Sequence, residues 1–394
     1  MLGEKITHTD SVQMALERQP KKYSEEERYK ILHNKHAAII SSNCGNAHKI
    51  RTACLKKKLT KYGANITVLL PKSDDWIAKK YNLSIEKNTW SITRSNICAN
   101  IVMRLPHRIL KLLQRGDIVP VIECDFVISA IGILNSQIAE IYNHIPIFIT
   151  TFSNMYGERT MYVHDDKPIY LDTFMKAAIN NAKLIKNRAY ACGFMVDDRF
   201  LTPDPDFVIP SINGFVYDSA KPVILVMFGG VGSNLLYDLA QKYANHPQYQ
   251  FVFVCGRSQD IQRKINDLVS QTACKNILNL GYVTNLVDYM HNSNIILTKA
   301  GDQTVSELCV TRLPVIFNVA KGQCLEHERT ALEFLEQNKL GVAIRDWNEV
   351  DNAIKQILAN PTMFQEAFDV VLHKYPANGL DNAIDAICDT LSSK

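Results

Sequence analysis

The sequence has no apolar run of about 18 residues, which is the length that a membrane-spanning helix requires. Its first residues, MLGEKITHTDSVQ, also have no apolar core like that of a secretory signal. We therefore expect neither a transmembrane helix nor entry into the secretory route through a signal peptide.

The ten cysteines form no CxxC pair and show no spacing typical of a metal site. Most lie in apolar runs, where a reduced thiol behaves as a small hydrophobic side chain. One acidic pair, Asp204 and Asp206, could suggest a metal, but Pro203 and Pro205 on either side of Asp204 favour a rigid linker. We expect a cytosolic protein with reduced thiols and no bound metal.

Strong charge of either sign is also missing. The formal net charge is +4, and lysine and arginine are spread along the chain, so we expect no nucleic acid as a partner. Hydrophobic residues make up 46% and charged residues 21%, which is typical of a globular protein. The 394 residues are enough for two domains with sizeable cores.

What the sequence does contain is a regular alternation of short apolar runs with helical patterns, which predicts an α/β fold with parallel sheets. Gly63 is expected to end the first clear helix. The expected strands lie at residues 37–40, 66–70, 126–129, 145–150, 223–228, 251–255, 276–283, 295–297, 313–317 and 341–344.

A segment rich in proline and turn residues, from Phe200 to Pro222, predicts a domain boundary. We expect two Rossmann-like domains that face a central cleft. The predicted parts are an extension or solvated helix (1–35), a first domain (36–205), a linker (206–221), a second domain (222–375) and a C-terminal helix that packs back on the first domain (376–394).

The segment 103–115, MRLPHRILKLLQR, combines basic and apolar side chains at helical spacing. One interpretation is an ordinary amphipathic helix with a solvated basic face. The other is a surface that docks on anionic lipid.

A glycine-rich turn, GGVGS at 229–233, follows the strand expected at 223–228. Glycines let backbone amides approach an anion closely, and the N-terminus of the following helix would favour a diphosphate. The turn differs from the dinucleotide-binding motif because Leu235 stands at the third glycine position, and the P-loop lysine is missing. Alternatively, a tight strand-to-helix turn simply requires these glycines.

Thr304 and Glu307 are three residues apart near the expected start of a helix. This spacing fits a capping box, in which both side chains bind the first helical amides. In the functional alternative, Thr304 and the helix amides meet a phosphate and the Glu307 carboxylate binds two hydroxyls of a ribose.

The order of GGVGS, GYVTNLVDYMHNSNIILTKAGDQTVSEL, RLPVIFN and KGQ resembles the carboxy-terminal domain of family 28 glycosyltransferases. These include monogalactosyldiacylglycerol synthases, diacylglycerol glucosyltransferases and the peptidoglycan N-acetylglucosaminyltransferase. The resemblance covers residues 222 to about 345. It implies the two-domain GT-B fold, with a UDP-sugar as donor substrate and no cofactor.

Carried over to this sequence, the resemblance implies that Gly230, Gly232 and Ser233 contact the diphosphate of the donor. It also implies that the backbone of Val283 recognises the uracil.

Gly301 lies between the strand expected at 295–297 and a following helix, a pattern typical of a phosphate-facing loop. The resemblance places Thr304 against a phosphate and Glu307 on the ribose. It places Gln323 near the donor sugar. Where the lipid galactosyltransferases have GQE, this chain has Gln323 followed by Cys324, so the identity of the sugar stays open.

In the first domain, the loop SSNCGNAH stands where the family has a glycine-rich loop that ends in histidine. His48 would then be the base that removes the acceptor proton, a task that suits an imidazole near neutral pH. A structural histidine is the alternative. The segment ITTFSNMYGERTMYVH resembles the acceptor side of the family, so Asn154, Tyr156 or His164 could line the cleft.

We therefore predict an inverting, metal-independent glycosyltransferase that moves a hexose from a UDP-sugar to an acceptor hydroxyl, with a lipid at an anionic membrane surface as the favoured acceptor. Such an enzyme would be cytoplasmic or peripheral on a membrane. Two alternatives stay open. One is a nucleotide-sugar epimerase or hydrolase on the same fold. The other is a catalytically silent module that only binds the nucleotide-sugar.

Overall fold

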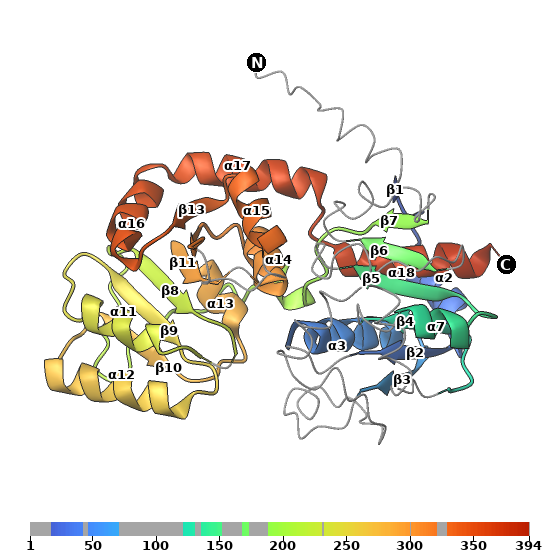
Figure 1. Cartoon of the computed structure of the whole chain (residues 1–394), viewed down its shortest axis with the longest axis horizontal. Helices are drawn as coiled ribbons and strands as arrows, with labels where there is room; N and C mark the ends of the chain where they lie inside the picture. Colours follow the sequence, from blue (N-terminus) through green and yellow to red (C-terminus); the bar gives the residue numbers. More distant parts are fainter. Residues whose placement is uncertain are drawn as a thin grey trace, which may run out of the picture. The chain divides into compact units, whose positions relative to one another are not determined.

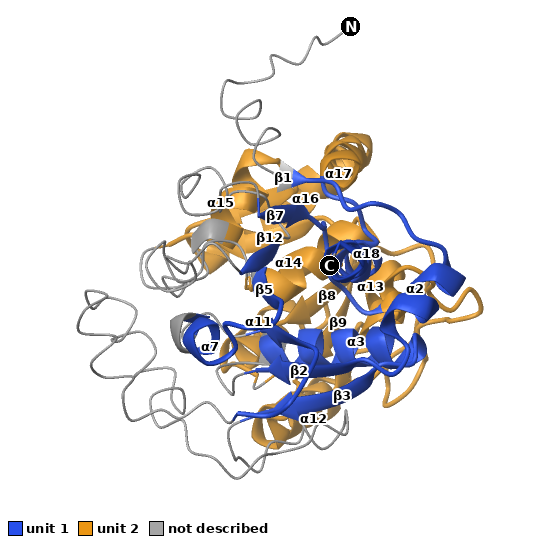
Figure 2. Ribbon diagram, turned by 90° about the vertical axis from the view of Figure 1, so that its right-hand side faces the viewer, with its two compact units in different colours: residues 1–197, 375–394 blue, residues 198–374 orange. Residues whose placement is uncertain are grey.

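The structure is a computed structural model that describes residues 17–41, 46–70, 121–130, 135–151, 168–172, 188–230, 232–299, 301–320 and 329–393. The chain forms two compact α/β units, coloured separately in Figure 2. Unit 1 comprises Met1–Asp197 and Tyr375–Lys394, and unit 2 comprises Asp198–Lys374. The first division thus lies at 197/198, before the segment that the sequence indicated as a linker.

The sheet of unit 1 has seven described strands, in the order β1-β7-β6-β5-β4-β2-β3, and every neighbouring pair is parallel. The strands are β1 (Glu17–Arg18), β2 (His36–Ile40), β3 (Asn65–Leu69), β4 (Phe126–Ser129), β5 (Ile147–Thr151), β6 (Ile169–Asp172) and β7 (Ala189–Ala191). Strands β2, β3, β4 and β5 confirm expected strands, whereas β1, β6 and β7 were not expected.

The described helices of unit 1 cover both faces of this sheet. They are α2 (Glu25–Leu32), α3 (Asn46–Lys61), α7 (Asn135–Ile141) and α18 (Gly379–Ser392). Helices α3 and α18 share one buried cluster with the sheet, and α7 shares the other. Helix α3 ends before Gly63, whose φ of +79° suits glycine, as the sequence predicted.

Helix α2 lies within the segment that the sequence presented as an extension or a solvated helix. Ser24 caps it, because its side chain accepts from Glu27 N while the Glu27 carboxylate accepts from Ser24 N. Leu32 is fully buried in the core of unit 1, and α2 packs against α18. The described part of this segment, residues 17–35, therefore belongs to unit 1.

The sheet of unit 2 has six described strands, all parallel, in the order β10-β9-β8-β11-β12-β13 (Figure 1). They are β8 (Val223–Met227), β9 (Gln250–Val254), β10 (Ile277–Leu280), β11 (Ile295–Thr298), β12 (Val315–Asn318) and β13 (Gly341–Ile344). All six were predicted, since parallel strands bury both faces and therefore appear as continuous apolar runs.

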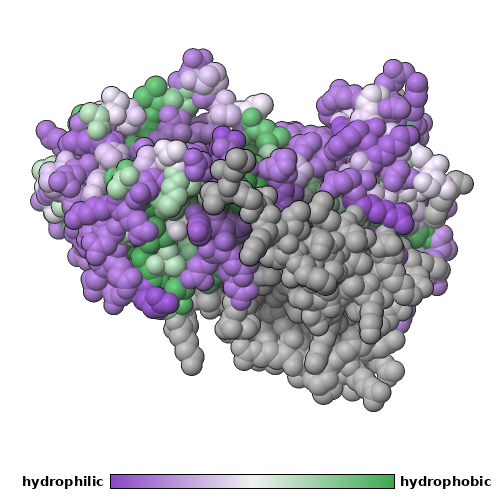
Figure 3. All heavy atoms as spheres, turned by 90° about the horizontal axis from the view of Figure 1, so that it is seen from above, coloured by the Kyte–Doolittle hydropathy of each residue, from purple (hydrophilic) through white to green (hydrophobic). Residues whose placement is uncertain are grey.

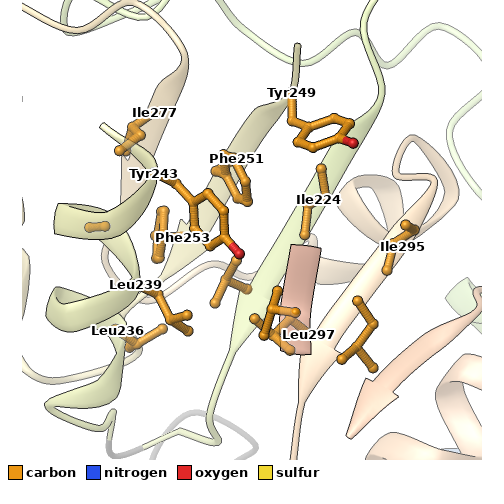
Figure 4. Close-up of a cluster of buried hydrophobic side chains, with 14 of the residues drawn as sticks. Ile224, Leu236, Leu239, Tyr243, Tyr249, Phe251, Phe253, Ile277, Ile295 and Leu297 are labelled. Carbon is orange, nitrogen blue, oxygen red and sulfur yellow. The ribbon is translucent and has the colours of Figure 1, made fainter. Parts of the chain in front are cut away.

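The described helical elements of unit 2 are η3 (Asp198–Phe200), α11 (Leu235–Tyr243), α12 (Gln259–Thr272), α13 (Leu286–His291), α14 (Asp302–Thr311), α15 (Arg329–Gln337), η5 (Trp347–Glu349), α16 (Val350–Ala359) and α17 (Pro361–Lys374). Helices α11, α12 and α16 pack on one face of the sheet. Figure 4 shows part of this core, where Tyr243 stacks on Phe251 with ring centroids 4.5 Å apart.

The cysteines that the structure describes carry no disulfide, and six of the seven are buried. Burial raises the pKa of the Cys255 thiol to about 12, so this thiol stays protonated at neutral pH. In Figure 3 the described surface is mostly hydrophilic, with hydrophobic patches between the polar side chains. Among the helices that the structure describes, none is both long and apolar enough to cross a lipid bilayer.

Candidate functional site

The strand order of unit 2 reverses between β8 and β11. From β8 the chain proceeds to β9 and β10 on one side, and from β11 it proceeds to β12 and β13 on the other. Because all neighbouring strands are parallel, the loops that follow them leave the same edge of the sheet. Ligands of open α/β sheets bind at such a switch point, outside the carboxyl ends of the strands.

The turn after β8 needs glycine at two positions. Gly229 and Gly232 have φ of +76° and +80°, a region that side chains with a Cβ rarely adopt. Gly230 O accepts a hydrogen bond from Arg257 N at 3.1 Å, so the turn is joined to the loop after β9. Ser233 Oγ accepts from Leu235 N at 3.3 Å, next to the start of α11. A Cβ on Gly232 would also lie 2.8 Å from Cys255 O. The glycines thus meet the structural requirement of a tight, closely packed turn.

Two cations were not identified from the sequence. Lys299 follows β11, and its Cε lies 3.3 Å from the position that a Cβ on Gly229 would occupy. Arg257 follows β9, and its backbone N–H binds the same turn. Both side chains are exposed, and that of Lys299 lies beside the glycine turn. The KAG motif includes Lys299, but its spacing alone does not show that this side chain reaches the turn.

Helix α14 follows β11, and it begins at Asp302 with Gly301 as its N-cap. Of the two alternatives for Thr304 and Glu307, the capping box is therefore wrong, because both residues lie inside the helix. Gly301 is extended, with φ of −85° and ψ of 143°, and no side chain caps the first turn. The helix N-terminus, with half-buried Thr304 in its first turn, is suited to an anion.

Glu307 lies one turn further along α14 and is only 7% exposed. Its Oε1 accepts a hydrogen bond from Gln303 Nε2 at 3.1 Å, and Gln303 is also 7% exposed. A carboxylate held in this way, one turn from an uncapped helix N-terminus, provides acceptors for ligand hydroxyls. Gln303 was not singled out from the sequence.

Val283 lies in the loop that follows β10 and is half buried. The carbonyl of the next residue, Thr284, accepts a hydrogen bond from Arg199 Nη1 at 2.9 Å. Arg199 therefore holds the loop whose backbone was expected to meet a uracil. Asp204, the candidate for a metal, instead accepts from Asp206 N at 3.0 Å through Oδ1 in a local turn.

His48 lies in the first turn of α3, in unit 1, and is 3% exposed. Its Nδ1 lies 2.8 Å from Ala130 O, in the loop that follows β4. Because a carbonyl can only accept, Nδ1 carries the hydrogen, and Nε2 of the neutral ring is then the basic nitrogen. Burial and this bond fix the ring, which suits both a structural histidine and an oriented base.

Several predicted site residues lie outside the described part of the chain. They are Gln323, Asn154, Tyr156 and His164, together with the basic segment 103–115. Of the predicted donor-site residues, the structure places Gly230, Gly232, Ser233, Val283, Gly301, Thr304 and Glu307 at the same edge of the unit 2 sheet or in the helix that starts there.

Comparison with known proteins finds a family match within unit 2. Residues 223–368 match the family model described as glycosyltransferase family 28 C-terminal domain. A processive diacylglycerol beta-glucosyltransferase from Staphylococcus saprophyticus is 30% identical over 177 residues, which are 44% of this chain and 42% of that protein. The chain thus spans less than half the length of this relative.

Solved structures show the same fold over most of the chain. MurG from Acinetobacter baumannii aligns with 91% of this chain and 100% of its own, with 17% identity and a TM-score of 0.53. MnaA from S. aureus, determined with UDP, aligns with 89% of this chain and 94% of its own, with 13% identity and a TM-score of 0.55. These likenesses confirm the GT-B fold that the sequence predicted.

Proposed function

We propose that this chain belongs to glycosyltransferase family 28, because its residues 223–368 match the C-terminal domain of that family, and that the protein transfers a hexose from a UDP-sugar to an acceptor hydroxyl with inversion at the anomeric carbon. The observation that carries the proposal is the edge of the unit 2 sheet at its switch point, where the glycine turn lies beside the uncapped N-terminus of α14. Buried Glu307 adds hydroxyl acceptors one turn away.

In the proposed reaction the acceptor oxygen attacks the anomeric carbon while the bond from that carbon to the diphosphate oxygen breaks, and the electron pair leaves with UDP. The amides of the glycine turn and of α14, with Thr304, bind the diphosphate, and Lys299 and Arg257 supply positive charge. These groups take the part that a metal ion has in other transferases. The Val283 backbone and Glu307 bind the uracil and the ribose, and Gln323 the donor sugar.

We assign to His48 the removal of the proton from the acceptor hydroxyl. The Ala130 carbonyl holds Nδ1–H, so Nε2 is the nitrogen that receives the proton as the new bond forms. A neutral histidine with this tautomer can accept the proton at Nε2 and release it afterwards.

The donor half is tested by calorimetric binding of UDP-glucose, UDP-galactose and UDP-N-acetylglucosamine and by release of UDP with added acceptor, each with and without EDTA. We expect one donor to bind and turnover to persist in EDTA. Glu307→Ala should weaken donor binding by about 10-fold or more, since it removes the carboxylate that accepts from the ribose. If no donor binds, or Glu307→Ala has no effect, the donor-site assignment is wrong.

Turnover then separates the proposed reaction from its alternatives. A transferase releases UDP only with an acceptor, and His48→Ala should lower kcat by about 100-fold or more without weakening donor binding. An epimerase or hydrolase would consume the donor without any acceptor. A silent module would bind the donor with no turnover, and His48→Ala would then change nothing.

For the acceptor, we propose a membrane lipid, because the relative from Staphylococcus saprophyticus is named for a diacylglycerol acceptor. The basic segment 103–115 would bring the protein to an anionic surface. Replacing Arg104, Arg108 and Lys111 with glutamine should weaken binding to phosphatidylglycerol vesicles by about 100-fold, since each cation near such a surface contributes about 1 kcal/mol.

The matched control replaces three exposed cations of unit 2, Arg263, Lys264 and Lys355, with glutamine. It changes the net charge equally and should bind vesicles nearly as the wild type does. Equal vesicle binding and equal yield of lipid-linked product in both triple variants would exclude the segment as the membrane surface.

A further inference from the structure

The hydrogen bond between Gln303 and Glu307 uses only half of the glutamine side chain. Nε2 donates to Glu307 Oε1 at 3.1 Å, but no donor among the described residues lies within hydrogen-bond distance of Gln303 Oε1. The residue is 7% exposed, so water reaches it poorly. A buried carbonyl oxygen without a donor is costly to a fold, and such atoms are rare in native proteins.

The position of this oxygen indicates which kind of group would satisfy it. Gln303 is the second residue of α14, a helix of ten residues, and Glu307 lies four residues later on the same face. An amide carbonyl accepts only from N–H or O–H donors. It therefore suits a hydroxyl of the ligand that also meets Glu307, and it does not suit a phosphate.

We propose that Gln303 is a specificity-determining residue, which forms with Glu307 a paired acceptor for the two vicinal hydroxyls of a ribonucleoside diphosphate. Gln303 Nε2 fixes the carboxylate, one ligand hydroxyl donates to Glu307, and the other donates to Gln303 Oε1. The inference rests on the proposed function, since it deepens the donor site of unit 2. It adds a residue and a selection against deoxyribonucleotides.

The geometry gives this pairing a physical basis. Two neighbouring hydroxyls present two O–H donors, and the pair presents the Glu307 oxygens and Gln303 Oε1 as acceptors on adjacent side chains. When one hydroxyl is missing, one buried acceptor stays unsatisfied while the rest of the nucleotide is bound. A site of this kind rejects the analogue more strongly than the lost contact alone would suggest.

The experiment measures calorimetric dissociation constants of UDP, 2′-deoxy-UDP and 3′-deoxy-UDP for the full chain. Gln303→Met keeps the length of the side chain and removes its amide. We expect the wild type to bind UDP at least about 10-fold more tightly than one deoxy analogue. Gln303→Met should weaken the binding of UDP by a similar factor and leave the binding of that analogue nearly unchanged. The selection between the two ligands would then be lost.

A matched control is Ser306→Ala, which removes another buried polar group of α14, one whose Oγ binds Asp302 O within the helix at 3.0 Å. It should preserve the selection. Melting temperatures of both variants report whether the helix remains intact.

Three results separate failure of the inference from failure of the proposed function. If the wild type does not bind UDP, the proposed function is overturned. If the wild type binds UDP and both deoxy analogues equally, hydroxyl selection is overturned without any variant. The third result is that the wild type prefers UDP, that Gln303→Met keeps the same ratio of dissociation constants, and that Glu307→Gln loses this preference. Glu307 then acts alone, and the role of Gln303 is overturned.

Discussion

At the scale of single residues, the donor edge of unit 2 depends on backbone atoms that lie too close for side chains. Gly230 O accepts from Arg257 N, and a Cβ on Gly256 would lie 2.6 Å from Gly230 O. Gly256 also has φ of +59°. The two loops after β8 and β9 therefore pack through their main chains, which keeps the glycine turn in one conformation.

Gly256→Ala is expected to lower the free energy of unfolding by about 2 kcal/mol or more, because it adds a backbone clash to the cost of a left-handed φ. Gly214→Ala is the matched control. Gly214 has φ of +85°, but a Cβ there would meet no atom within 4 Å, so we expect a loss of only about 1 kcal/mol. Urea unfolding measures both values, and equal losses would contradict the proposed packing of the two loops.

The same scale explains why the capping-box alternative for Thr304 and Glu307 fails. Thr304 and Glu307 have the spacing of a capping box, but that spacing also occurs inside a helix, where residues three apart lie on one face. The true N-cap, Gly301, has no side chain that could mark it. A pattern of side chains therefore could not locate a helix start that the backbone alone defines.

At the scale of elements, α18 is joined to α2 and α3 by ion pairs that are mostly shielded from water. Arg28 Nε binds Asp385 Oδ1 at 2.7 Å, and Lys58 Nζ binds Asp381 Oδ1 at 2.8 Å. Asp385 is fully buried. The C-terminal helix is thus part of the structural core of unit 1.

Arg28→Met should lower the free energy of unfolding by about 3 kcal/mol, because it leaves the buried Asp385 carboxylate without its main partner. The control on the same helix is Lys30→Met, whose ion pair with Glu26 is exposed and is worth about 0.5 kcal/mol or less.

Arg28→Met combined with Asp385→Leu should recover most of the loss, since neither member of the Arg28–Asp385 pair is then left as an unpaired buried charge. Urea unfolding of the wild type, Arg28→Met, Asp385→Leu and the double variant gives the coupling free energy between the two positions. If the double variant is as unstable as the sum of its single changes, the two side chains are not coupled.

At the scale of the whole molecule, the strands that could be predicted from the sequence are those that form continuous apolar runs. The strand Val223–Met227 is a run of five buried apolar residues, and its type and place followed from that run. Strands β1, β6 and β7 have only two to four residues and no periodic pattern, so they could not be predicted. They are defined by pairing with distant parts of the chain.

The candidate site divides in the same way. The order of the motifs predicted that the glycine turn and α14 lie at one edge, because the topology of parallel strands requires it. The contributions of Lys299 and Gln303 could not be predicted, since they depend on where a side chain ends and on which of its atoms have partners. Such facts are properties of the packed structure.

The return of the chain to unit 1 has a consequence for its synthesis. Phe194 N binds Pro376 O at 2.9 Å, and Gly379 N binds Phe194 O at 3.0 Å, so the last segment completes a structure begun nearly two hundred residues earlier. On the ribosome, unit 2 emerges as one continuous piece and can fold at once. Most of unit 1 is translated first but cannot bury the face that α18 covers until α18 has also been translated. During that interval this unit is the part of the nascent chain that most needs a chaperone.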